Sequence, residues 1–260
     1  SDVSADVNGD GKMDGEDLWG FLGGTDVAPC FYIGSGGTVV SRDKDGGLYD
    51  SLPSDKNFAI IEKVQALMTD EDNFYNHHLG TQDLAKTDDN EYRDLFSGGH
   101  GLFFWTRMDE VTTLRGMETD FGILPLPKLK EEQAGYNTWS TYNSYVVSIP
   151  YTCANPERTS AIMEALFEES SYDLKNAYVE EALKYKTTRD DESIEMLDII
   201  FANTLYDIGI VYNFGGTTTA LANIVERRTI GALTSQLNKL KASAGSDIDK
   251  LLVKLGYKEA

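Results

Sequence analysis

The sequence has few of the features by which several large classes of protein are recognised. Its 260 residues include two cysteines, three histidines and no apolar run close to the ~18 residues that cross a bilayer. Basic residues are also scarce, because 23 Lys and Arg stand against 43 Asp and Glu, a formal net charge of −20. A polyanion binder needs Lys and Arg clustered on one face, so this balance disfavours nucleic acid and anionic membranes as partners. Cys30 and Cys153 lie far apart without metal-ligand spacing, which favours two free thiols over a disulfide.

Familiar catalytic signatures are missing as well. No nucleophile elbow, cofactor loop or His/Cys constellation stands out, so we expect no enzyme. The segment SGG at 35–37 lacks the Lys and the spacing of a phosphate-binding loop. With 43 carboxylates, some pair able to act as acid and base is unavoidable. A carbohydrate-active enzyme using paired carboxylates therefore stays open as an alternative.

The most specific motif is a loop of oxygen-bearing side chains at residues 6–17, DVNGDGKMDGED. Oxygens fall at loop positions one, three, five, nine and twelve, and glycine occupies position six, where the chain must turn sharply. A hard cation takes about 6–8 oxygens, so we expect a structural Ca²⁺ site rather than a sensor. The predicted ligands are Asp6, Asn8, Asp10, Lys12 through its carbonyl, Asp14 and Asp17.

Two other interpretations of this loop stay open. One is an acidic turn that binds no metal. The other follows from its resemblance to the first calcium loop of dockerin modules, which would make the chain an extracellular interaction module. A dockerin needs a second such loop about two dozen residues later, and none follows.

The segment at residues 95–130 is predicted to form the centre of the fold. Glycines at 98, 99 and 101 end a helix, residues 102–105 form a buried strand, residues 109–115 a helix, and residues 121–124 a second buried strand. Strand, helix and strand in so few residues predict a βαβ unit in a parallel or mixed sheet. The polar and aromatic residues that follow the first strand lie where open α/β sheets place ligands.

The rest of the chain alternates strands and helices. We expect a strand at 18–22, a hairpin around the turn DKDGG, and a strand at 144–149. A helix capped by Asn155 begins at Pro156. The other expected helices are 55–69, 90–96, 172–185, 190–205, 217–227 and 232–255, the last continuous through Gly245.

The order of these blocks resembles a known family. The blocks are GFL, GSGG and DKDG, then YRDLFSGGHGLFF, FGILPLPKL, a strand ending in SIP, and the helix NPERTSAIMEAL. They resemble extracellular solute-binding proteins of family 1 of ABC importers, which are maltose-binding-protein-like. The resemblance implies an α/β, periplasmic-binding-protein-like fold whose two lobes clamp a ligand.

The resemblance also implies a division of the chain. Residues 1–142 would belong to the second lobe, a mixed sheet with flanking helices that carries the calcium-type loop at 6–17. Residues 143–204 would be a first-lobe segment of one strand and helices, and residues 205–260 would return to the second lobe as C-terminal helices. The first lobe's N-terminal sheet has no counterpart here, so we expect a chain truncated at its N-terminus.

The function implied by the resemblance is capture of an extracellular solute, a sugar or oligosaccharide, for an ABC permease. A monomer, anchored by lipid at the cell surface, is expected. Aromatic faces stack on sugar rings while polar side chains bond to hydroxyls, although each aromatic residue taken singly could equally be part of the core. The ligand-binding residues implied by position are Thr25, Asp26, Trp105, Arg107, Asp109, Trp139, Tyr142, Asn213 and Phe214.

Overall fold

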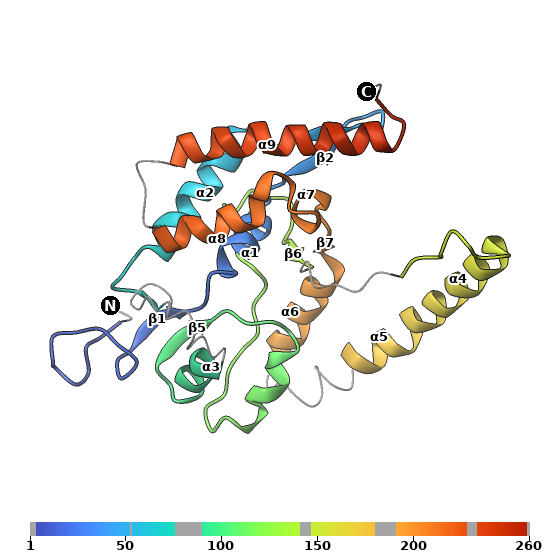
Figure 1. Ribbon diagram of the computed structural model, residues 1–260. Coiled ribbons are helices and arrows are strands. Elements are labelled where there is room, and N and C mark those ends of the chain that lie inside the picture. Colours follow the sequence, from blue (N-terminus) through green and yellow to red (C-terminus); the bar gives the residue numbers. More distant parts are fainter. Residues whose placement is uncertain are drawn as a thin grey trace.

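The computed structural model describes residues 4–52, 54–75, 90–140, 147–179, 191–227 and 233–258. Within those ranges the chain is a mixed α/β structure, in which three small sheets are surrounded by helices (Figure 1). None of the helices in these ranges is long and apolar enough to cross a membrane. The two cysteines are both free thiols.

The sheet that positions the candidate site is parallel. Strand β1 (Trp19–Leu22) lies between β4 (Phe74–Tyr75) and β5 (Gly101–Phe104). Helix α3 (Asn90–Ser97) leads into β5. It ends at Gly99, whose φ of +82° lets the His100 N–H reach the Leu95 carbonyl at 2.9 Å. The predicted strand at 18–22, helix at 90–96 and glycine stop are therefore confirmed.

The second half of the predicted βαβ unit is wrong. The predicted helix is a 3₁₀ helix, η3 (Glu110–Gly116), and residues 121–124 are irregular. The Ile123 N–H donates to the Ser193 hydroxyl at 2.8 Å instead of to a strand. The first strand is also not buried. It lies at the edge of the sheet, and its residue Leu102 is 55% exposed.

The largest core lies between a hairpin and the helices that cover it (Figure 1). The hairpin pairs β2 (Val40–Arg42) with β3 (Leu48–Asp50), as predicted from DKDGG. The Ser54 hydroxyl caps its helix by accepting from the Asn57 N–H at 3.1 Å. The helical elements of this part are α1 (Val27–Gly34), α2 (Asp55–Met68), α7 (Ile208–Val211), η5 (Phe214–Gly216), α8 (Thr217–Arg227) and α9 (Leu233–Lys254).

The remaining elements form a second group. Helix α6 (Asp191–Ala202) packs on η3 through a small core of Val111, Ile123, Leu197 and Ile200. Strand β6 (Thr138–Trp139) pairs in parallel with β7 (Thr204–Leu205).

Helices α4 (Pro156–Tyr172) and α5 (Leu174–Asn176) extend away from the rest of the described chain (Figure 1). The Asn155 side chain caps α4, as predicted, and α4 has no buried residue. Of the expected strand at 144–149, residues 147–149 are irregular and the others lie outside the described ranges, as do residues 180–185 of the expected helix at 172–185.

Candidate functional site

A cavity of about 710 Å³ opens at the end of β5. Its walls come from the strand end, from η3, from the irregular residues 121–126 and from β6. We call it the Trp105 cavity. Four of the residues predicted to contact a ligand line it together: Trp105, Arg107, Asp109 and Trp139.

Trp105 is held by the sheet and by helix α1. Its backbone N–H donates to the Leu22 carbonyl at 3.0 Å, which extends the β1–β5 pairing by one residue. The thiol of Cys30, on α1, also lines the cavity. Burial raises the pKa of this thiol and the negative charge of Asp26 adds to the effect, while a hydrogen bond from Trp105 acts in the opposite direction. Cys30 is therefore a neutral, apolar part of the wall.

Arg107 and Asp109 form a two-pronged ion pair at the cavity. Arg107 Nε lies 3.1 Å from Asp109 Oδ1, and Nη2 lies 3.3 Å from Oδ2. Nη2 also approaches the carboxylate of Glu110, at 3.4 Å from Oε1. The hydrogen bond from Arg107 is the main cause that lowers the pKa of Asp109. The turn after β5 thus presents a guanidinium paired with a carboxylate.

The opposite wall is formed by β6. Trp139 is 7% exposed and lies where β6 pairs with β7. Beside it, the Thr138 hydroxyl is buried and makes no hydrogen bond within the described part of the chain. Thr106 and Ser140 bring two further hydroxyls to the lining. The cavity therefore combines aromatic faces with a few polar groups, which is the usual character of a small-molecule site.

The other predicted contacts are placed elsewhere. The Thr25 carbonyl accepts from the Ala28 N–H at the start of α1, and Asp26 is exposed next to it. Phe214 is buried in the large core, and the Asn213 side chain accepts from the Thr218 N–H at 2.9 Å. The structure thus gives Asn213 and Phe214 roles in capping and packing around α8. Tyr142 lies outside the described residues.

Several lining residues were not predicted from the sequence. Phe103 and Phe121 were assigned to buried strands, and Cys30 was assigned only as a free thiol. No motif marks these residues. The available signal was the apolar character of the segments on both sides of Trp105, which does not distinguish a cavity wall from a core.

The loop at 6–17 turns as the motif predicts. Gly11, at position six, has a φ of +80°, and its N–H donates to Asp6 Oδ2 at 2.8 Å. Asp17 is fully buried, and its two carboxylate oxygens accept from the Val7 and Asp14 N–H groups at 3.0 and 2.9 Å.

The metal itself fits this loop only in part. Oxygen donors of these types suit Ca²⁺. Within the described residues, however, no three His, Cys, Asp or Glu side chains lie close enough together to hold a metal ion. The predicted ligand side chains instead accept hydrogen bonds from the loop's own backbone, as Asn8 and Asp10 do from the Asp10 and Lys12 N–H groups.

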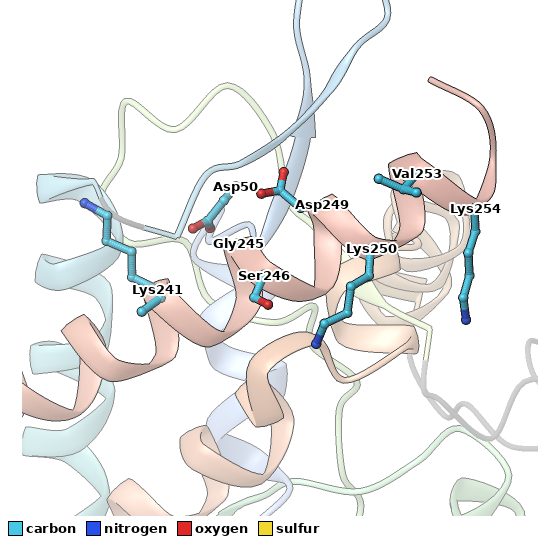
Figure 2. Close-up of a pocket in the computed structure, with 9 residues that line it drawn as sticks. Asp50, Lys241, Gly245, Ser246, Asp249, Lys250, Val253 and Lys254 are labelled. Carbon is cyan, nitrogen blue, oxygen red and sulfur yellow. The ribbon is translucent and has the colours of Figure 1, made fainter. Parts of the chain in front are cut away.

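A second, more open hollow of about 810 Å³ runs along α9. Figure 2 shows Asp50, from β3, near Asp249 of α9, while Lys250 and Lys254 of the same helix extend away from these two carboxylates. Burial is the main cause that raises the pKa of Asp50. Among its described lining residues there is no aromatic side chain, so it offers no flat face for a ring to stack on.

Comparisons with protein-family models, with curated proteins and with solved structures find no match for this chain.

Proposed function

We propose that this chain is the solute-binding component of an ABC importer and that the Trp105 cavity holds part of a sugar or oligosaccharide. The observation that carries the proposal is the convergence of Trp105, Arg107, Asp109 and Trp139 on one cavity. Trp105, Arg107 and Asp109 come from the turn after β5, and Trp139 comes from β6.

The chemistry of the cavity supports a carbohydrate. Sugar rings present C–H groups that pack on aromatic side chains, and Trp105 and Trp139 bring two such side chains to the lining. The described lining also carries three hydroxyls, one guanidinium and one carboxylate, groups of the kinds that hydrogen-bond to sugar hydroxyls. The volume of about 710 Å³ falls within the usual ~300–1,000 Å³ of small-molecule pockets.

The same lining favours binding over hydrolysis. Glycosidases of the usual kind place two carboxyl groups about 5–10 Å apart on either side of the bond they cleave. Asp109 is the only carboxylate among the described residues of the lining, and Arg107 engages both of its oxygens. A carbohydrate-active enzyme is the alternative that this arrangement disfavours.

The assignment to lobes is part of the same proposal. Residues 143–204 would belong to the first lobe, and the uncovered apolar residues of α4 agree with that assignment. A permease in the membrane and a lipid anchor at the cell surface follow from the proposed family.

We also propose that Ca²⁺ stabilises the loop at 6–17. The fully buried Asp17 and the glycine turn at Gly11 support this, because they fix the last residue of the loop and the sharp turn at its middle. The ligands would be those that the spacing predicts, from Asp6 to Asp17. The ion would supply charge compensation for a strongly acidic loop and would take no part in binding the solute.

The binding function is tested with neutral mono-, di- and trisaccharides, by titration calorimetry and by tryptophan fluorescence. Trp105 and Trp139 lie in the cavity, whereas Trp19, the third tryptophan, is buried in another core. A saccharide that binds should change the fluorescence of Trp19→Phe as it does that of the unmodified chain. Trp105→Leu should weaken binding by about twofold to tenfold, since an aromatic contact contributes about 0.5–1.5 kcal/mol. Release of cleaved sugar would overturn the proposal.

A further inference from the structure

In the described part of the chain, the Trp105 cavity is lined by one cation and one carboxylate, Arg107 and Asp109, which belong to a larger cluster with a surplus of carboxylates. Arg107 is the only cation among the described residues that line it. Arg107 and Arg93 face three carboxylates, those of Asp94, Asp109 and Glu110, with N–O distances of 3.1 to 3.8 Å. This cluster therefore carries a net charge of −1, on a chain whose formal net charge is −20.

The guanidinium edge that would recognise an anion is already occupied. A carboxylate or phosphate binds Arg best through two parallel N–H groups. Arg107 directs Nε and Nη2 at the two oxygens of Asp109, and Nη2 also at Glu110. An anionic ligand that binds through this edge would have to displace Asp109, and one that binds the remaining N–H groups would lie beside the carboxylates of Asp109 and Glu110.

An uncharged sugar meets no such obstacle. Its hydroxyls can accept from the outer N–H groups of a guanidinium or donate to a carboxylate that stays in place. Its ring can pack on Trp105 without a change in the ion pair. The same cavity therefore costs an anionic sugar an electrostatic penalty that a neutral one avoids.

We infer that the Trp105 cavity selects uncharged saccharides and rejects their uronic acid counterparts, with the Asp109–Arg107 pair as the element that excludes anions. This inference rests on the proposed function and adds a charge preference to it. Asp109 is thus a specificity-determining residue, which acts by occupying Arg107.

The test compares a neutral trisaccharide that binds with the same trisaccharide in which each C6 hydroxymethyl group is oxidised to a carboxylate. In low salt the neutral sugar should bind at least about fivefold more tightly, as expected for one like-charge contact near water. The ratio should shrink at 1 M salt, where the Debye length falls from about 10 Å to about 3 Å.

Two variants separate the proposed cause from general repulsion. Asp109→Asn keeps the shape of the side chain and weakens its hold on Arg107, so the uronic acid should gain about twofold to fivefold in affinity relative to the neutral sugar. Glu118→Gln removes one exposed negative charge just after η3, away from the lining, and should leave the ratio unchanged.

The outcomes distinguish the two proposals. If the unmodified chain binds the uronic acid as tightly as the neutral sugar, or if Asp109→Asn and Glu118→Gln give the same ratio, the charge preference is overturned and the binding function stands. If neither sugar binds, the proposed function fails and the inference fails with it.

Discussion

The carboxylate of Asp207 accepts a hydrogen bond of 2.6 Å from the backbone N–H of Val39, which lies 168 positions earlier in the chain. The other oxygen accepts from the Gly209 N–H at 2.8 Å, so the same side chain caps α7. One buried carboxylate therefore ties the start of the hairpin to the segment that leads into α8.

We expect Asp207→Ala to lower the free energy of unfolding by about 2–4 kcal/mol, because it leaves buried N–H groups without acceptors. Urea unfolding measures the change. Asp43→Ala is the matched control: its carboxylate also accepts from two backbone N–H groups, of Asp45 and Gly47, but at an exposed turn. It should cost less than about 1 kcal/mol, since water replaces the lost acceptor. Equal losses in the two variants would contradict the role of Asp207.

Asp207 also predicts a pH dependence. Burial is the main cause that raises the pKa of its carboxyl above the usual 3.8, although the bonds from Val39, Gly209 and neighbouring N–H groups oppose the rise. At pH values between the pKa of this carboxyl in the unfolded chain and its raised pKa in the folded chain, the folded chain holds the proton more tightly. The stability linked to that proton is complete below the unfolded pKa and is lost as pH rises through the folded pKa.

The measurement compares the unmodified chain with Asp207→Asn, which stays neutral like the protonated acid. The stability of the unmodified chain relative to the variant should fall as pH rises from about 3.5 towards neutrality. Subtracting the free energy of unfolding of Asp207→Asn from that of the unmodified chain at each pH removes the contribution of the other carboxylates. A relative stability that increases over this range would show that the hydrogen bonds outweigh burial.

The sequence predicted those elements whose determinants are local. Asn155 and Ser54 cap their helices because a side-chain oxygen reaches a nearby N–H, and Gly99 ends α3 because glycine adopts a positive φ without cost. The strand at 121–124 was predicted wrongly for a non-local reason. A short apolar run is compatible both with a strand and with a buried irregular segment. Here the Ile123 N–H donates to the Ser193 hydroxyl and not to a neighbouring strand.

The positions of the candidate-site residues were also predictable where they depend on local sequence. Trp105, Arg107 and Asp109 follow a strand end, where a general rule for α/β sheets places ligands. Trp139 reaches the cavity because of the β6–β7 pairing, whose partner strand is 66 positions away in sequence. Asn213 and Phe214 come from a polar, aromatic segment whose composition suggested the rim of a binding site. Phe214 is instead buried in the core, because α9 packs against η5, a contact that the sequence does not reveal.

Ca²⁺ should raise the melting temperature of the chain if the loop at 6–17 binds it. At a free concentration 100 times Kd, the expected stabilisation is about 2.7 kcal/mol, or several degrees for a chain of this size. Asp10→Ala should abolish the response, because it removes a ligand oxygen from the loop. Asp43→Ala, in the other acidic turn, should keep it. A melting temperature that is unchanged by Ca²⁺ and by a chelator would contradict the proposed site.

Gly215 should tolerate no side chain, because α9 passes directly over it. An added Cβ would lie 2.5 Å from the backbone N of Ala244 and 3.0 Å from the Leu240 carbonyl oxygen. Gly215→Ala combines this clash with a φ of +62°, for an expected loss of about 2–5 kcal/mol. Gly216→Ala is the control: its φ is +75°, but nothing lies within 4 Å. It should lose only the backbone cost of about 1–2 kcal/mol.

Helix α4 should be insensitive to the loss of its apolar side chains. Leu166 is 61% exposed, although leucine at such a position in a long helix usually packs on a neighbour. If nothing covers it, Leu166→Ala should change the free energy of unfolding by less than about 0.5 kcal/mol. Leu237→Ala, on α9 and 3% exposed, should cost about 2–5 kcal/mol. A similar loss in both variants would mean that α4 is covered in solution. Sedimentation would then show whether a second copy covers it, because only that contact would depend on protein concentration.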